Sequence, residues 1–280
     1  MKAFFSRFAA HRGALVGLII LAGVLLMAAT CSLWFEESPW AMVAEPLIPP
    51  FQNGDYWFGT DMLGRDLAAG LAYGARVSLL VGVVSTVVAV LVGVLLGALA
   101  GYYGGWVDDV LMRLTEFFQT IPQLAMAVVL VAIFTPSIYS IVGAIAVVSW
   151  PPVARLVRGE FLTLRQREFV QAAVVIGQRP ARIIFSQILP NVMAPIVVTA
   201  SLMIATAILT ESALSFLGLG DRNLMSWGFM IGAARTMLRE APMMSVLPGV
   251  AILLTVLAIN LIGEGLNDAT NPQLRRRGEA

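Results

Sequence analysis

Long apolar runs without any charged residue alternate with shorter polar segments along most of this chain. The uncharged runs cover residues 14–35, 77–107, 117–154, 183–210 and 241–263. Their apolar residues are continuous rather than alternating, which favours helices over strands. About 20 apolar residues cross a bilayer as a helix, and only helices or closed barrels satisfy their backbone in lipid. The pattern therefore predicts an all-α, polytopic membrane protein.

The run 117–154 is long enough for two crossings and is interrupted by Pro122 and by the turn-like segment 135–137. Counting it twice gives six transmembrane helices, of which the third and fourth would be short. A re-entrant hairpin in this run, which would leave five crossings, is the alternative.

Composition supports a location in the bilayer. Of the 280 residues, 59% are hydrophobic and 12% are charged, whereas soluble domains carry roughly 25% charged residues. The net charge of +1 gives no electrostatic footprint for nucleic acid. With one histidine and one cysteine, the chain offers no metal-ligand cluster, no nucleophile–base pair and no cofactor site.

The distribution of cationic residues predicts the orientation. Six crossings leave thirteen Lys and Arg residues on the side of both termini and five on the other. Because cytoplasmic loops are enriched in Lys and Arg, both termini are predicted to be cytoplasmic in a bacterial-type inner membrane. The expected divisions are a cytoplasmic N-terminus 1–13, a first transmembrane helix 14–35, an external loop 36–76, a transmembrane core 77–263 and a cytoplasmic tail 264–280.

Three glycines four residues apart, Gly93, Gly97 and Gly101, lie in the second predicted span. A helix face without side chains lets another helix approach closely. The spacing predicts a tight helix-packing seam, either within this chain or against a partner.

A carboxylate, Glu211, follows the hydroxyl residues Ser201, Thr206 and Thr210 near the end of the fifth span. Carboxylates in membranes usually face a cavity or a partner. These four residues are candidates for lining a passage, although Glu211 could equally mark the watery outer end of its span.

The cytoplasmic loop 155–190 contains the long basic stretch between spans. Apolar positions 169, 170, 173 and 174 fall on one helical face, Gly177 suits a helix end and Pro180 suits the start of another helix. The segment is therefore predicted to form a helix–turn–helix that lies on lipid or fills a groove in another protein. Lys2 is the only lysine, so the chain has no phosphate-binding loop of its own.

This segment resembles the EAA loop of the membrane subunits of ATP-binding-cassette (ABC) importers, which contacts the ATPase. The pattern reads Gln171-Ala172-Ala173, three residues, Gly177, nine residues, then Gln187 followed by Ile188-Leu189-Pro190. The chain departs from the family at Gln171, where the family has Glu, and at Gln187, where it has Ile. Glu168 stands one turn before Gln171 and is a candidate to supply the missing carboxylate.

Five further segments narrow the resemblance to C-type permease subunits of dipeptide, oligopeptide and nickel importers. They are WFGTDMLGRD (57–66), YGARVSL (73–79), AGYYGGW (100–106), ESALSFLGLG (211–220) and LTVLAINLIG (254–263). The resemblance implies a type I ABC importer transmembrane domain that works with a second permease subunit, two ATPase subunits and an extracytoplasmic solute-binding protein. ATP hydrolysis would lie on the partners, and alternating access would be driven through the loop. An ion-coupled secondary transporter or channel is the alternative, but the inverted repeat that such proteins often show is not evident.

Overall fold

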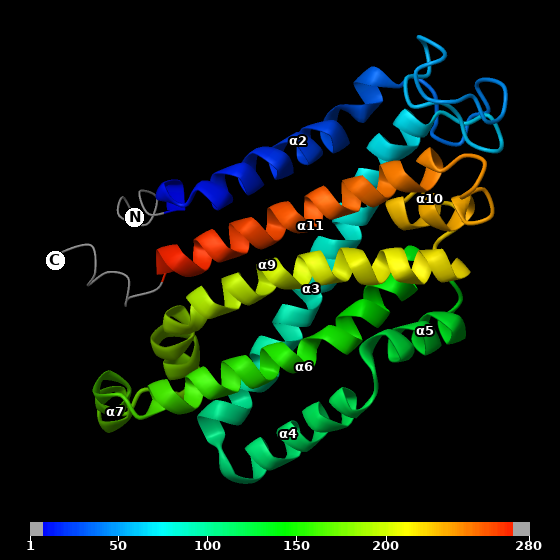
Figure 1. Cartoon of the computed structure of the whole chain (residues 1–280). Helices are drawn as coiled ribbons and strands as arrows, with labels where there is room; N and C mark the ends of the chain where they lie inside the picture. The colour runs from blue at the N-terminus through cyan, green and yellow to red at the C-terminus, as the bar shows by residue number, and fades with distance from the viewer. Residues whose placement is uncertain (1–7, 271–280) are drawn as a thin grey trace.

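The computed structural model describes residues 8–270, which form a bundle of long helices with a short helical hairpin at one end (Figure 1). In chain order the elements are α2 Arg12–Trp34, α3 Leu67–Tyr103, α4 Gly105–Thr120, α5 Gln123–Phe134, α6 Ile138–Arg165, α7 Glu168–Val175, α8 Pro180–Arg182, the π-helix η1 Ile183–Ile188, α9 Leu189–Leu214, the π-helix η2 Ser215–Leu219, α10 Trp227–Ala234 and α11 Met243–Thr270. The described residues do not include Lys2, Arg7 and Arg275–Arg277, whose predicted position is on the cytoplasmic side.

Within residues 8–270, five helical segments are long and apolar enough to cross a membrane, and a sixth is reached if the bent pair α4–α5 is one span. The two members of this pair meet at 87°. Pro122 accounts for the break, because a residue that precedes proline avoids the helical region, and Ile121 is extended with φ −93° and ψ 130°. The expectation of two short central spans is wrong for the fourth, since α6 runs over 28 residues.

Three helices are longer than expected: α3 begins earlier, and α6 and α11 end later. Helix α3 begins at Leu67 because the Asp66 side chain accepts a hydrogen bond from the Ala68 amide at 2.8 Å and caps the first turn. The polar connection before it is therefore shorter than the expected 36–76 loop. Helix α6 continues to Arg165, well into the predicted 155–190 loop, and α11 continues to Thr270, past the predicted end at residue 263.

The glycine face of α3 packs against α6 of the same chain. A Cβ atom added at Gly97 would lie 2.4 Å from the Ala154 carbonyl oxygen, and one at Gly93 would lie 2.6 Å from Cβ of Val153. One at Gly101 would meet Phe161 Cβ at 2.6 Å. The predicted seam therefore joins two helices of this chain.

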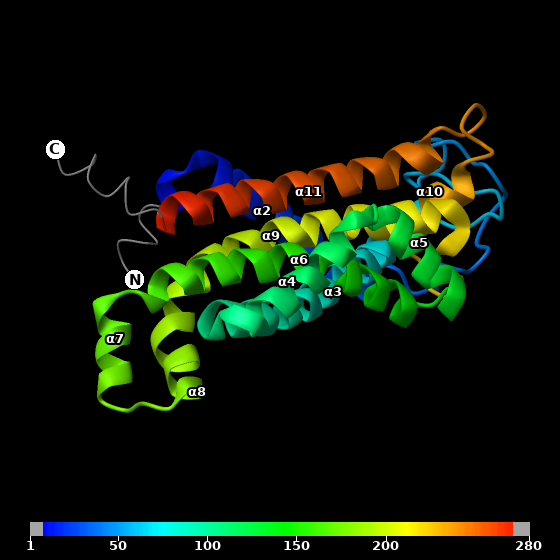
Figure 2. The ribbon, with the colours of Figure 1, turned by 90° about the horizontal axis from the view of Figure 1, so that it is seen from below.

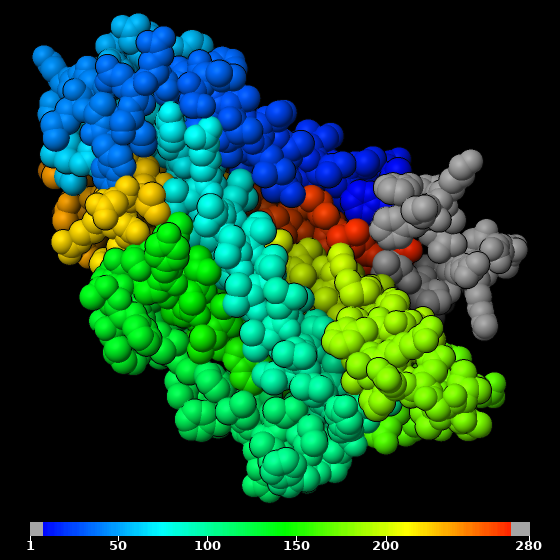
Figure 3. Space-filling view, turned by 180° about the vertical axis from the view of Figure 1, so that it is seen from behind, coloured from blue at the N-terminus to red at the C-terminus, as the bar shows by residue number. Residues whose placement is uncertain are grey.

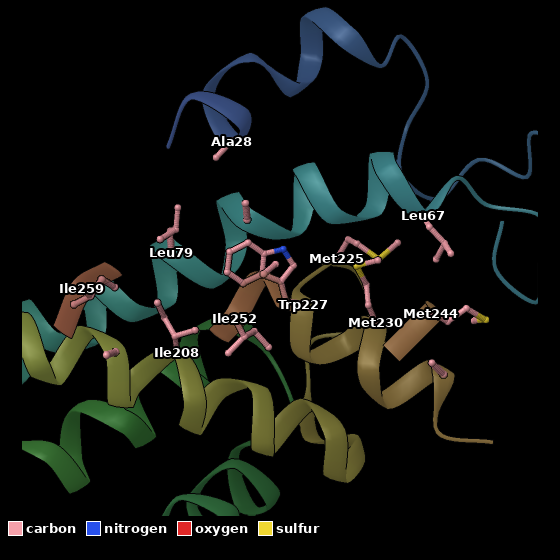
Figure 4. Packing of buried hydrophobic residues seen from close by; sticks show 14 residues of the cluster. Ala28, Leu67, Leu79, Ile208, Met225, Trp227, Met230, Met244, Ile252 and Ile259 are labelled. Atoms are coloured by element: carbon pink, nitrogen blue, oxygen red, sulfur yellow. The ribbon is translucent and has the colours of Figure 1, made fainter. Parts of the chain in front are cut away.

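At the end of the molecule opposite the hairpin, α10 is inserted between α3 and α11. Its side chains are part of a buried hydrophobic cluster. Figure 4 shows the indole of Trp227 near the centre of this cluster, flanked by Ile252 and Met225. Its Nε1 donates to the Leu71 carbonyl at 2.9 Å and its backbone N–H donates to Ser78 Oγ at 3.2 Å. Because Trp227 is fully buried, these two bonds set the position of α10 against α3.

Replacing Gly97 tests the seam. Gly97→Val should lower the yield of folded protein and its melting temperature in detergent, because overpacking a closely packed contact costs about 1–3 kcal/mol. Gly97→Ala should have a smaller effect in the same direction.

The matched control is Gly143→Ala in α6, where an added Cβ would have no atom within 4 Å. Equal melting temperatures for Gly97→Val and Gly143→Ala would contradict the packing assigned to this face.

Candidate functional site

Helices α7 and α8 form a hairpin that projects from the end of the bundle (Figure 2). Gly177 ends α7 with φ +74°, a left-handed conformation that favours glycine. The Gly177 amide donates to the Val174 carbonyl at 2.9 Å, and the Gln178 amide donates to the Ala173 carbonyl at 3.0 Å. These two hydrogen bonds are the pair that defines a Schellman cap. Pro180 then starts α8. The helix, sharp turn and second helix expected from the sequence are present.

One face of α7 is buried within this chain. Val170 and Ala173 share a hydrophobic cluster with Phe161 of α6 and with Ile183 and Ile188 of η1. This corrects the expectation that the whole apolar face 169, 170, 173 and 174 meets lipid or a partner. Ala173 is 5% exposed, so it anchors the hairpin and is closed to a partner.

The hairpin still exposes large apolar side chains near its tip. Val175 is 85% exposed and Ile176 is 72% exposed. We call the exposed set Phe169, Val174, Val175 and Ile176 the tip patch. Val174, Val175 and Ile176 directly precede Gly177, where an added Cβ would have open space, whereas Phe169 lies in the first turn of α7. A solvent-facing apolar group of this kind marks a contact surface.

The remaining residues of the loop pattern lie around this hairpin. Glu168, Gln171 and Ala172 are exposed on α7, whereas Leu189 is half-buried and Pro190 exposed at the start of α9. The structure thus brings the α7 residues and Gly177 together on the projection, while Leu189 and Pro190 belong to its base.

Gln171, which departs from the family pattern, has a local structural role. Its Nε2 donates to the Arg165 carbonyl at 2.9 Å, one of the last carbonyls of α6, which has no partner within that helix. A glutamate at this position could not donate that bond. The amide therefore ties the start of the hairpin to the helix that carries it.

Glu211 lies inside the protein near the C-terminal end of α9. It is 2% exposed and accepts hydrogen bonds from Ser226 Oγ at 2.7 Å, Ser215 Oγ at 2.8 Å and Ser212 Oγ at 3.4 Å. The carboxylate thus faces neither an open passage nor outer water in this structure, in contrast to both expectations. It joins α9 and η2 to Ser226, the residue that caps α10.

The structure does not place the three hydroxyl residues that were candidates for lining a passage, Ser201, Thr206 and Thr210, in contact with the Glu211 carboxylate. Ser201 Oγ donates to the Val198 carbonyl at 2.7 Å and faces Gly263 of α11. Thr206 and Thr210 are at least partly exposed on α9 and donate to carbonyls of their own helix. They remain candidates for a surface of the passage, whereas Ser201 belongs to a helix contact.

The serines around Glu211 were not singled out from the sequence. Ser226 carried a usable signal, since a serine before the apolar segment Trp227–Ala234 is an N-cap pattern. Asp108 and Arg158 form a second unforeseen pair, with Nη2 to Oδ2 at 2.6 Å. They are 50 residues apart, and no local pattern connects them.

The architecture is that of the membrane domain of an ABC transporter. It aligns with a chain in a solved structure of the MetNI methionine ABC transporter in inward-facing conformations, with a TM-score of 0.60 and 18% identity. The alignment covers 72% of this chain and 97% of that chain. At this identity the likeness establishes the fold, and it confirms the predicted fold class.

Sequence comparison identifies the family. Residues 93–276 match the binding-protein-dependent transport system inner membrane component. The dipeptide transport system permease protein DppC of Alkalihalophilus pseudofirmus is 40% identical over 97% of this chain and 89% of its own length. The oligopeptide transport system permease protein OppC of Escherichia coli K12 is 40% identical over 96% and 90%. The chain therefore belongs to the inner-membrane permease subunits of binding-protein-dependent ABC importers.

Removing the carboxylate at residue 211 tests its structural role. Glu211→Leu leaves the Ser215 and Ser226 hydroxyls without their buried acceptor, so the free energy of unfolding should fall by about 3 kcal/mol. Glu211→Gln keeps an acceptor oxygen and should lose clearly less. Thermal unfolding in detergent measures both, and a Glu211→Leu variant that melts with the wild type would refute the role.

Proposed function

We propose that this chain forms half of the translocation pathway of an ATP-driven peptide importer and is coupled to a separate ATPase through the α7–α8 hairpin. The observation that carries the proposal is the projecting hairpin, whose buried face is joined to two long helices while its tip patch is exposed. Such a two-sided element is suited to receive a push from a partner and to pass it on.

The charge distribution supports a cytoplasmic position for the hairpin. Arg155, Arg158, Arg165, Arg167, Arg179 and Arg182 lie on the hairpin or on the end of α6 next to it, whereas Arg65, Arg76, Arg222, Arg235 and Arg239 lie toward the opposite end. By the positive-inside rule, the hairpin end faces the cytoplasm, where ATP and an ATPase partner are found. The polar segment before α3 and helix α10 then face outward.

The packing of the hairpin supports alternating access. Val170 and Ala173 contact the same buried cluster as Phe161 of α6 and Ile188 of η1. Movement of the hairpin would therefore carry the inner ends of α6 and α9 with it. The π-helix η1 lies between the hairpin and α9, and π-helical segments often lie at functional positions.

The substrate class follows from the relatives. Those at 40% identity carry the names dipeptide and oligopeptide transport system permease, so peptides are the substrate that we propose. The importer would be completed by a second permease subunit, two ATPase subunits that hydrolyse ATP, and an extracytoplasmic binding protein that delivers the peptide.

Placing a charge in the tip patch tests the coupling. Val175→Asp should reduce peptide uptake and co-purification of the ATPase at least tenfold, because a carboxylate would be desolvated in the contact without a partner. Val175 is highly exposed, so the variant should fold normally. Uptake by proteoliposomes that contain the full transporter and ATPase recovery on affinity purification provide the two measurements.

Thr163→Asp is the matched control, since this residue is exposed on α6 outside the tip patch. It should retain uptake and ATPase recovery. Normal coupling in Val175→Asp would refute the assignment of the tip patch to the ATPase contact.

Single-cysteine labelling tests the orientation. In a Cys31→Ser background, Gln52→Cys should react with a membrane-impermeant maleimide in intact cells, because Gln52 is exposed in the segment before α3. Thr163→Cys should react only in inside-out vesicles. The reverse pattern would show that the hairpin faces outward.

A further inference from the structure

A charged cleft lies between α4 and the inner half of α6, on the same side of the molecule as the hairpin. Its volume is about 690 Å³, and it is lined by Asp109, Met112, Arg113, Glu116, Arg155 and Arg158. In Figure 3, α4 forms the lower edge of the molecule, where the cyan of α3 passes into green. The volume lies within the range of small-molecule sites, and of these residues only Arg158 has a structural contact described above.

Helix α4 has two dissimilar faces. Exposed apolar side chains recur along one of them at Trp106, Val110, Leu114, Phe117 and Ile121. The charges Asp109, Arg113 and Glu116 recur along the other at a spacing of four and three residues, which keeps them on one side of the helix. Charges inside membrane segments face a water-filled cavity or pair with one another rather than meeting lipid. The charged face of α4 is turned to the cleft.

The charges of the cleft are only partly used by the protein itself. Arg158 is held by Asp108, and Arg155 Nη1 donates to Gln119 Oε1 at 2.7 Å. Among the described residues, Asp109, Arg113 and Glu116 have no ion pair or side-chain hydrogen bond. The cleft therefore presents two carboxylates and two guanidinium groups, those of Arg113 and Arg155, that are able to bind a ligand.

The lining of the cleft begins near the hairpin end of the bundle and runs along α4 from Asp109 to Glu116. Arg158 lies beside Gly101, close to the end of α3. Glu116 lies seven residues beyond Asp109 on α4, which corresponds to roughly 10 Å along a helix. A solute leaving the middle of the membrane for the cytoplasm could follow this charged face.

We propose that this cleft is the inner part of the passage in this subunit and that it binds the two charged ends of a short peptide. The inference rests on the proposed peptide importer. Arg113 and Arg155 take the terminal carboxylate, and Asp109, four residues before Arg113, takes the terminal ammonium group. Residues four apart on α4 are about 6 Å apart along the axis, close to the length of roughly 7 Å that two extended residues span.

The charge balance favours a zwitterion over an anionic lipid headgroup. Two carboxylates face the cleft beside the guanidinium groups of Arg113 and Arg155, neither of which is in an ion pair, so these four charges sum to zero. A phosphate group would be attracted by the arginines and repelled by Asp109 and Glu116. A peptide with both ends free offers a partner to both kinds of charge.

Cysteine protection in the complete transporter tests the binding. Glu116→Cys in a Cys31→Ser background should react with a membrane-impermeant maleimide from the cytoplasmic side in inside-out vesicles. Alanyl-alanine should slow this reaction at least tenfold at saturation. N-acetyl-alanyl-alanine amide, which has the same backbone without charged ends, should not.

Three outcomes would overturn the proposal. They are a cysteine at position 116 that does not react from the cytoplasmic side, equal protection by both peptides, and protection by glycerol phosphate rather than by alanyl-alanine. The last outcome would identify a lipid headgroup site.

Uptake provides the second measurement. Arg113→Gln should lower the maximal rate of alanyl-alanine uptake about tenfold, as loss of one charged hydrogen bond implies, without changing the concentration of loaded binding protein at half-maximal rate. Arg239→Gln, an exposed arginine outside the cleft, is the control and should transport normally. Arg113→Gln at the wild-type rate would refute a role in passage. If the wild-type transporter took up no dipeptide at all, the proposed function would fail instead.

Discussion

The close contact between α3 and α6 is the constraint on which the rest of the structure depends. Backbone atoms of α6 lie where side chains of α3 would otherwise stand, because Gly93, Gly97 and Gly101 have none. Helices in lipid gain little from the hydrophobic effect on association, so dispersion contacts at short range have to hold them together. The α3–α6 pair in turn provides the surface on which α9 packs and the end from which the hairpin projects (Figure 1).

Two buried carboxylates, one toward each end of the bundle, are held in the same way. At the end that carries α10, the Glu211 carboxylate is surrounded by serine hydroxyls and fastens α10 to α9. At the hairpin end, Arg158 is paired with Asp108 and fastens α4 to α6. Each buried charge is satisfied by groups from another element, so the charges that remain unpaired in the α4–α6 cleft stand out. That contrast between paired and unpaired charges is the physical basis for assigning a ligand to the cleft.

The hairpin has the two properties that the proposed coupling requires. Its inner face, through Val170 and Ala173, is part of the hydrophobic cluster of the membrane domain, while its tip patch remains exposed. Gln171 adds a hydrogen bond to the end of α6. A rigid attachment of this kind transmits a displacement, whereas a flexible loop would absorb it.

Much of the fold could be predicted from local patterns. Uncharged apolar runs located the long helices, and Gly177 with Pro180 marked the turn of the hairpin. The orientation indicated by the arginines stays a prediction. Boundaries were less predictable: α3 begins ten residues before the predicted Val77, because capping by Asp66 and packing of its first turns on α10 extend the helix. Pro122 was recognised as an interruption, but the 87° bend at α4–α5 depends on how both helices pack.

The sequence by itself located the long apolar helices and the turn of the hairpin, because hydropathy and turn chemistry act over a few residues. Only the tertiary structure decided which residues meet. It placed the glycine seam against α6, enclosed Glu211 among serines, turned Ala173 inward and gathered the charges of α4 and α6 around one cleft. These outcomes depend on residues far apart in the chain, such as Asp108 and Arg158, that become neighbours only when the helices have packed.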